Sequence, residues 1–232
     1  MEVIILAGGL GTRLRKLSGD LPKPMMPVCG KPFLEILLDS LSRKGITHVV
    51  LSVGYKANVI VSYFGNQYNG MRISYSLESR PIGTGGGVRL AMDKIEDDHT
   101  FIINGDTYME FDFAAIEDHW LKNSRPIIVA LSVADRTRYG SLVCEKGIAI
   151  SLSEKGNKGP GLINAGCYIL KRDQLNSFNS GESFSLEKDY LVNAIAQRKF
   201  DVIESFGTFI DIGVPNDYYQ AQKMFNQKDI LF

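Results

Sequence analysis

Apolar and polar positions follow two different rhythms along the 232-residue chain. Short runs rich in Val and Ile, typical of strands buried on both faces, alternate with segments in which apolar residues recur at helical spacing. The predicted strands cover residues 3–7, 48–53, 72–77, 100–104 and 127–133. The predicted helices cover residues 33–44, 84–94, 113–122, 185–198 and 215–225. This alternation predicts an α/β fold in which helices cover a largely parallel sheet.

The second half of the chain departs from strict alternation. Residues 140–144 and 149–154 flank a Glu-Lys-Gly turn and are typical of a hairpin, so we expect a mixed, mostly parallel central sheet. Residues 157–161 resemble a linker but are too few to separate domains, and we interpret them as a loop. The length suits one α/β domain, so residues 1–232 are predicted to form a single unit.

Composition excludes several classes of partner. Lys and Arg total 26, Asp and Glu also total 26, and no basic block is present, so nucleic acid is not an expected partner. The longest apolar runs are far shorter than the roughly 20 residues that span a bilayer, so no membrane partner is expected either. The start of the chain has no signal-peptide pattern, which favours a cytoplasmic location. The aromatic content permits an apolar homodimer patch but does not locate one.

A glycine-rich loop directly after the first strand carries the strongest chemical signal. Gly8, Gly9 and Gly11 free the backbone to turn with positive φ and to direct several N–H groups at an anion. The loop lacks the Gly-Lys-Ser/Thr ending of a P-loop, and Leu14 stands where a dinucleotide fingerprint needs its third glycine. A plain strand-to-helix turn is the alternative, and a phosphate cradle is the interpretation that we favour.

Two cations strengthen this interpretation. Arg13 lies within the loop, and Lys23 follows in a segment that Pro22, Pro24 and Pro27 restrict in φ. A lysine held in this way serves as a preset charge for a phosphate group.

Together these residues resemble the signature of the sugar-1-phosphate nucleotidyltransferases, or nucleoside-diphosphate-sugar pyrophosphorylases. The signature is Gly-Gly-Leu-Gly-Thr-Arg-Leu followed by Pro-Lys-Pro-Met, and further motifs follow in order at 78–86, 104–106, 154–155, 164–166, 184–187 and 209–215. The resemblance implies a three-layer Rossmann-like nucleotidyltransferase fold. It also implies the reaction of a nucleoside triphosphate with a sugar 1-phosphate to give a nucleoside-diphosphate sugar and pyrophosphate. The Gly-Thr-Gly-Gly stretch at 83–86 is most similar to bacterial D-glycero-D-manno-heptose 1-phosphate guanylyltransferases, with mannose-1-phosphate guanylyltransferases next.

The resemblance also implies roles for individual residues. The catalytic residues would be Arg13, Lys23 and Asp106. The nucleotide would contact Leu6, Ala7, Gly8, Gly9, Gly11, Thr12, Glu78, Pro81, Gly83, Thr84 and Gly85. The sugar phosphate would contact Gly105, Tyr139, Gly140, Lys155, Asn164 and Glu187. The attacking phosphate oxygen is already ionised near neutral pH, so the reaction needs positioning and electrostatics rather than a general base.

Asp106 and Asp211 each follow an apolar run, which places them at the carboxyl edge of a sheet. From the residues alone, turn or cap roles suit both of them. The resemblance implies that they bind Mg²⁺, which typically takes one or two carboxylates together with substrate phosphates.

The nucleobase and even the activity remain open at this stage. A carboxylate at Glu78 suits guanine, so we expect GTP, while relatives that use UTP or dTTP carry similar acids. A catalytically silent nucleotide-sugar sensor is a second hypothesis. A glycosyltransferase with an Asp-x-Asp motif is a third, although Tyr108 stands where its second Asp is required.

Overall fold

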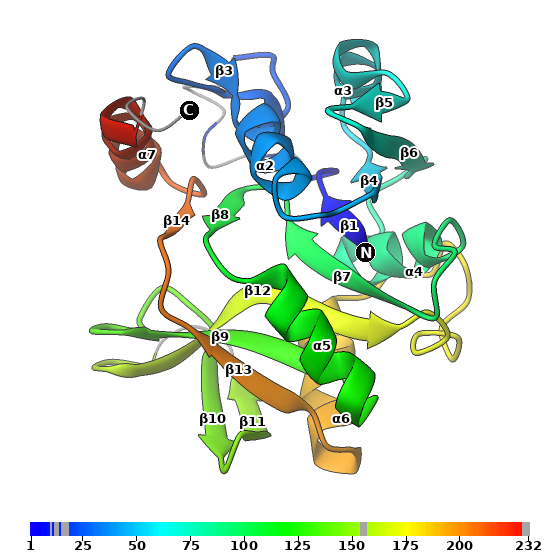
Figure 1. The fold of residues 1–232 in the computed structure, drawn as a ribbon, viewed down its shortest axis with the longest axis vertical. Helices are drawn as coiled ribbons and strands as arrows, with labels where there is room; N and C mark the ends of the chain where they lie inside the picture. The colour runs from blue at the N-terminus through cyan, green and yellow to red at the C-terminus, as the bar shows by residue number, and fades with distance from the viewer. Residues whose placement is uncertain (10, 12–13, 15–18, 154–156, 229–232) are drawn as a thin grey trace.

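The computed structural model describes residues 1–9, 11, 14, 19–153 and 157–228. In this part of the chain, a ten-stranded sheet lies between helices on both of its faces, which gives three layers (Figure 1). The strands of this sheet are β1 (Glu2–Leu6), β4 (His48–Val53), β5 (Gln67–Tyr68), β6 (Met71–Leu77), β7 (His99–Asn104), β9 (Ile127–Val133), β10 (Ser141–Glu145), β11 (Ile148–Ser153), β12 (Gly161–Lys171) and β13 (Asp201–Ser205). Two small antiparallel sheets pair β2 (Pro27–Val28) with β3 (Lys31–Pro32), and β8 (Thr107–Met109) with β14 (Phe209–Asp211).

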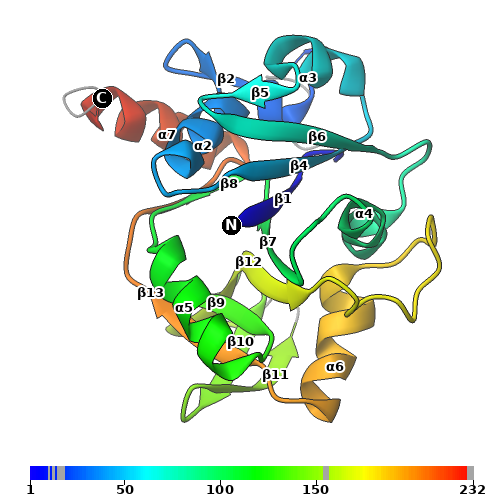
Figure 2. The ribbon, with the colours of Figure 1, turned by 45° about the vertical axis from the view of Figure 1, so that its right-hand side comes forward.

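The helices divide between the two faces of the large sheet, as Figure 2 shows. One face carries α2 (Phe33–Ser42), α3 (Ala57–Phe64), α5 (Phe113–Asn123) and α7 (Pro215–Lys228). The other carries α4 (Gly83–Met92), the π-helix η3 (Leu186–Leu191) and α6 (Val192–Gln197). A short 3₁₀ turn, η2 (Lys23–Met25), holds the proline-restricted segment. In the described residues, no helix has both the length and the apolar composition needed to cross a membrane.

The large sheet is mixed, in the order β10-β11-β13-β9-β12-β7-β1-β4-β6-β5. One parallel group comprises β7, β1, β4 and β6, and a second comprises β9 and β13. Strand β12 lies antiparallel between the two groups, paired with β7 on one side and β9 on the other. The predicted mixed sheet is confirmed, but the predicted parallel majority is not, because β12 and the β10–β11 hairpin add antiparallel pairs.

Strand β1 marks the point where the chain changes direction across the sheet. The chain passes from β1 to β4 and β6 on one side, and then returns to place β7 on the other side of β1. In open α/β sheets, ligands bind outside the carboxyl ends of the strands at such a switch point. The glycine-rich loop after β1 therefore begins where this topology favours a site.

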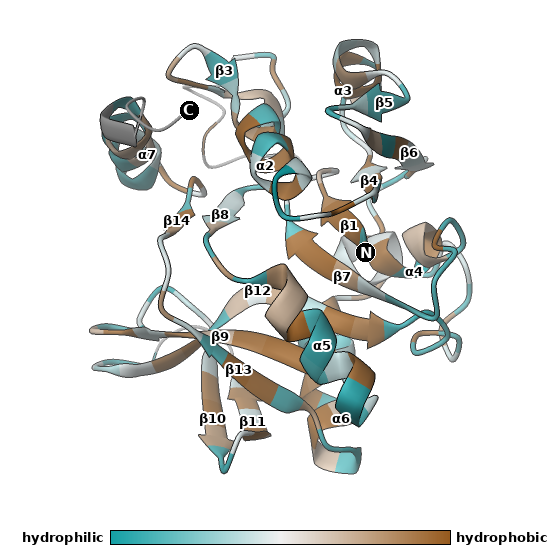
Figure 3. Ribbon diagram, in the orientation of Figure 1, coloured by the Kyte–Doolittle hydropathy of each residue, from teal (hydrophilic) through white to brown (hydrophobic). Residues whose placement is uncertain are grey.

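Two apolar clusters form the core, one on each face of the sheet. Alternate residues of β1 face opposite ways, so Val3 and Ile5 belong to the cluster under α2 and α5, whereas Ile4 belongs to the cluster under α4 and α6. Figure 3 shows hydrophobic central strands, and helices that contain both hydrophobic and hydrophilic residues. This packing explains the unbroken apolar runs in the central strands.

The elements differ from the predictions at several places. The helix predicted at 185–198 is divided, because η3 and α6 follow each other over that range. Strands β12 and β13 and helix α3 were not predicted from the pattern. In β12, Asn164 and Gly166 interrupt the apolar run at a register shift against β9, which obscures its periodicity.

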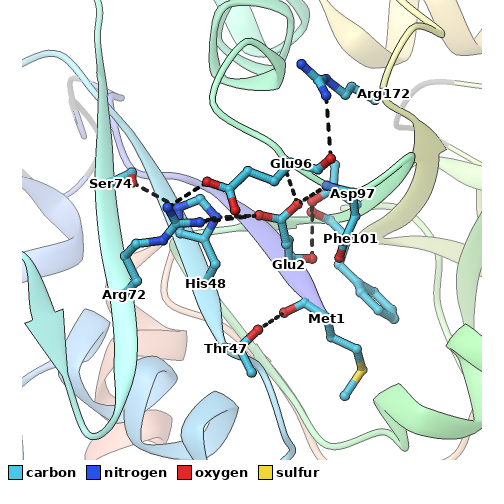
Figure 4. Close-up of polar contacts among 11 residues, drawn as sticks. Met1, Glu2, Thr47, His48, Arg72, Ser74, Glu96, Asp97, Phe101 and Arg172 are labelled. Carbon is cyan, nitrogen blue, oxygen red and sulfur yellow. Dashed lines mark hydrogen bonds and ion pairs between the residues drawn. The ribbon is translucent and has the colours of Figure 1, made fainter.

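The amino edge of the sheet is closed by a buried polar cluster around Glu2, drawn in Figure 4. One carboxylate oxygen of Glu2, Oε2, accepts hydrogen bonds from the backbone N–H groups of Glu96 (2.8 Å) and Asp97 (2.7 Å). The other oxygen lies 2.5 Å from Nδ1 of His48, whose Nε2 is 2.9 Å from the Ser74 hydroxyl. Glu2 and His48 are almost fully buried, and both find their hydrogen-bond partners within the protein. We therefore interpret this cluster as structural.

Candidate active site

A cavity of about 830 Å³ opens at the carboxyl edge of the sheet, over the ends of β1, β6 and β7 and beside the middle of β12. It brings together segments that are far apart in sequence, from the glycine-rich loop to the turn before α7. Most residues predicted for the site line it: Leu6, Ala7, Gly8, Gly9, Gly11, Lys23, Glu78, Pro81, Gly83, Thr84, Asp106, Tyr139, Gly140, Asn164, Glu187 and Asp211.

Two predicted glycines, Gly85 and Gly105, are not among the residues that line the cavity, and both are closely packed. A Cβ atom at Gly85 would lie 2.2 Å from the Phe184 ring, and one at Gly105 would lie 2.7 Å from the carbonyl oxygen of Leu6. Both positions therefore require glycine, because neighbouring segments approach closely. Three other predicted residues, Thr12, Arg13 and Lys155, lie outside the described residues.

The two aspartates lie side by side because β8 pairs with β14. In this pairing Asp211 is opposite Thr107, and the backbone N–H of Ile212 donates to the Asp106 carbonyl at 2.9 Å. Nζ of Lys23 reaches the same place from η2 and lies 2.5 Å from Oδ2 of Asp106. The structure thus joins three predicted residues that lie up to 188 positions apart (211 − 23).

The electrostatics of this trio favour a further cation. Burial, and then the negative charge of Asp106, raise the pKa of Asp211, while Lys23 and the backbone N–H of Gly213 act against that rise. Among the described residues, the ammonium group of Lys23 does not outweigh the effects of burial and of Asp106 on Asp211. In the described residues no group of three or more His, Cys, Asp and Glu side chains forms a complete metal cage. Two carboxylates without a cage suit a hard divalent cation that takes its remaining ligands from phosphate and water.

Glu78 lies directly beside the glycine-rich loop at the end of β6. The Ser52 hydroxyl donates to its Oε1 at 3.1 Å. A Cβ atom at Gly8 would lie 2.7 Å from this oxygen, and one at Gly87 would lie 3.1 Å away. A side chain at Gly8 would therefore crowd Glu78, whose carboxylate is held at the wall of the cavity. Of the described loop glycines Gly8, Gly9 and Gly11, only Gly11 has the predicted positive φ (57°).

The wall beyond Glu78 is formed by side chains that are hydrogen-bonded around Glu187. The Thr84 hydroxyl donates to Glu187 Oε2 at 2.9 Å and accepts from the backbone N–H of Leu186 at 2.9 Å. The buried Tyr168 hydroxyl donates to Oε1 of Glu187 at 3.4 Å and accepts from Nδ2 of Asn164 at 2.7 Å. Burial raises the pKa of Tyr168 well above its ordinary value, so this hydroxyl keeps its proton. Asn164 and Glu187 are thus held in set orientations.

Sequence reasoning missed Arg138, Tyr168 and Ser185, which also line the cavity. Tyr168 is an aromatic residue in an apolar strand, which by pattern alone is typical of a core residue. Arg138 directly precedes the predicted Tyr139, and this adjacency was the one available signal.

A glycine-walled cavity at the switch point of the sheet, with a lysine and two carboxylates at its centre, defines a nucleotide-binding α/β enzyme of the phosphate-transferring class. A family model described as nucleotidyl transferase matches residues 2–228. The chain belongs to this family, as its motifs predicted.

Individual relatives cover nearly the whole chain. It is 41% identical to D-glycero-alpha-D-manno-heptose 1-phosphate guanylyltransferase of Aneurinibacillus thermoaerophilus, over 96% of this chain and 97% of that protein. It is 40% identical to the enzyme of the same name from Campylobacter jejuni, over 94% of this chain and 97% of that protein. The crystal structure of HddC from Yersinia pseudotuberculosis complexed with GMP-PN matches with a TM-score of 0.84 and 39% identity, over 97% of this chain and 99% of that chain.

Proposed function

We propose that this protein transfers a guanylyl group from GTP to D-glycero-α-D-manno-heptose 1-phosphate. An oxygen of the sugar phosphate attacks the α-phosphorus of GTP, the bond from that phosphorus to the bridging oxygen breaks, and pyrophosphate leaves with the electron pair. The observation that carries the proposal is the meeting of Lys23, Asp106 and Asp211 in one cavity at the carboxyl edge of the sheet. The heptose phosphate guanylyltransferases named above support the choice of base and sugar.

Within this proposal the chain's own residues position charge. The loop at Gly8, Gly9 and Gly11 presents backbone N–H groups to the phosphates, and Lys23 supplies an ammonium group from a restrained segment. The carboxylate of Glu78 accepts hydrogen bonds from the base, which suits the N1–H and N2–H groups of guanine. Asn164 and Glu187, oriented through Tyr168, bind sugar hydroxyls.

Asp106 and Asp211 would hold Mg²⁺. Bound there, the ion would neutralise charge on the phosphates that are brought together. The raised pKa of Asp211 supports this role, because a cation at the pair would offset both causes of the rise, which are burial and then the negative charge of Asp106. We also place the reaction in the cytoplasm.

A matrix of nucleoside triphosphates against sugar 1-phosphates, scored by pyrophosphate release, tests the proposal. We expect the highest kcat/KM for GTP with the heptose 1-phosphate, and loss of release when Mg²⁺ is chelated. The Asp106→Asn variant is the control for contaminating activity. A preference for mannose 1-phosphate would select the second candidate sugar, and a clear preference for UTP or dTTP would refute the guanylyl assignment.

A further inference from the structure

A two-pronged ion pair joins the sugar side of the cavity to the first turn of α7. Nη1 of Arg138 donates to Oδ1 of Asp217 at 3.1 Å, and Nη2 donates to Oδ2. The Asp217 side chain is 10% exposed, whereas that of Arg138 is 47% exposed and lines the cavity. A buried carboxylate that binds both terminal nitrogens of a guanidinium holds its plane in one orientation.

Ring contacts extend this pair to the strand that carries Asp211. The Arg138 guanidinium lies over the Tyr139 ring, 5.5 Å from its centroid. The Tyr139 ring in turn meets the ring of Phe209 edge to face, with 5.8 Å between centroids. Phe209 and Asp211 are the two ends of β14. A continuous series of contacts therefore runs from α7 through Arg138 and Tyr139 to β14, the strand that ends at Asp211.

The pair differs from an ordinary surface salt bridge in what it orients. Exposed ion pairs contribute little, because solvent screens them and two long side chains lose freedom. Here one partner is buried, and in the described residues the hydrogen bonds of the guanidinium go to Asp217 alone. Because Tyr139 and Gly140 follow Arg138 directly, any shift of Arg138 moves the wall of the predicted sugar pocket.

We propose that Arg138 and Asp217 form a positioning unit, which holds the Tyr139–Gly140 wall of the sugar pocket in place relative to the strand that bears Asp211. The inference rests on the proposed function and extends it to two residues that the sequence motifs did not indicate. Arg138 acts here through Tyr139 and β14, and the unit governs how well the sugar 1-phosphate is placed for attack.

The chain offers a matched control in a second Arg–Asp pair. Nε of Arg125 lies 2.7 Å from Oδ1 of Asp201, and Nη2 lies 3.0 Å from Oδ2. The side-chain exposures, 41% and 3%, are close to those of the first pair. Arg125 precedes β9 and Arg138 follows it, so the two pairs lie at opposite ends of one strand, and Arg125 and Asp201 do not line the cavity.

The test compares Arg138→Lys, Asp217→Asn, their double variant and Arg125→Lys by steady-state kinetics and thermal melting. Lysine keeps the charge but cannot form the two-pronged contact. We expect both single variants to raise KM for the sugar 1-phosphate about tenfold through misplacement of the wall, with KM for GTP changed less than about twofold. The double variant should be no worse than the singles, because both remove one unit. Arg125→Lys should lower the melting temperature and leave both KM values unchanged.

Each outcome decides the inference. Equal changes in the two KM values, or an Arg138→Lys enzyme that behaves like Arg125→Lys, would overturn the positioning unit while leaving the proposed function in place. A wild-type protein that releases no pyrophosphate with any pair of substrates would overturn both. If Asp217→Asn does not fold, Arg138→Lys, which retains the charge, decides alone.

Discussion

Carboxylates lie at both the amino edge and the carboxyl edge of the central sheet, but they differ in the partners that surround them. At the amino edge, Glu2 accepts two backbone hydrogen bonds and contacts His48, so its acceptor sites are taken by the protein itself. At the carboxyl edge, Asp106 and Asp211 face each other with one ammonium group nearby. The carboxylate at the amino edge is fully paired, whereas at the carboxyl edge the described residues place two carboxylates and one ammonium group beside a cavity.

This difference separates a stabilising carboxylate from one that serves a ligand. A buried charge with a full set of partners contributes to the fold, and its loss leaves those partners unsatisfied. A carboxylate pair that repels itself costs stability, and the protein retains this cost where a cation is to bind. Substitutions at the carboxyl edge should therefore mainly lower activity, and substitutions at the amino edge should mainly lower stability.

The largest effect is expected from Asp106→Asn. The amide keeps the shape but removes a negative charge from the centre of the site, so kcat for pyrophosphate release should fall about 100-fold or more. Because Lys23 and Asp211 remain in place, the melting temperature should stay near that of the wild type. A variant with normal turnover and an unchanged requirement for Mg²⁺ would contradict the role of Asp106.

At the amino edge, Glu2→Ala should act on stability instead. It leaves two backbone N–H groups and His48 without their buried partner, so the free energy of unfolding should fall by about 2–4 kcal/mol. Turnover per folded molecule should not change. Urea denaturation measures the loss, and Glu96→Ala is the control, because solvent screens the exposed Glu96–Arg72 pair and its loss should cost much less stability. If the two variants lost the same free energy of unfolding, the buried position of Glu2 would not explain its contribution to stability.

The smallest effect, and the sharpest contrast with Glu2, is a gain in stability from Asp211→Asn. Removing one of two facing charges should raise the free energy of unfolding on the order of 1 kcal/mol at neutral pH, while Mg²⁺-dependent turnover is lost. Since the folded state raises the pKa of Asp211, its protonated form stabilises the fold below the ordinary pKa, and this contribution is lost as the pH rises through the raised value. The advantage of the variant should therefore shrink as the pH falls. Urea titrations at several pH values measure it, and a variant that is less stable at neutral pH would refute the repulsion.

Much of the fold could be predicted because local patterns persisted into the tertiary structure. The predicted strand at 48–53 has the bounds of β4, and the helix at 113–122 falls within α5, whose Asp112 side chain caps it by accepting from the backbone N–H of Ala115. Strand β12 escaped prediction because Asn164 and Gly166 break its apolar run, although they lie in the middle of the sheet.

The candidate site was also predicted only in part. Motifs brought Lys23, Asp106 and Asp211 to attention one at a time, but their closeness depends on the β8–β14 pairing. No motif indicated Tyr168 or Arg138, because their contacts with Asn164 and Asp217 form only in the folded chain.

By itself the amino-acid sequence determined the membership of the nucleotidyl transferase family, the glycine-rich loop after the first strand and the residue types of the site. These are local properties, set by backbone freedom, apolar spacing and charge. Only the tertiary structure decided which carboxylates meet, how closely other segments approach Gly85 and Gly105, and that Arg138 pairs with Asp217 beside the cavity. The reason is physical: repulsion, burial and close approach depend on distances between segments up to two hundred residues apart, and folding alone fixes those distances.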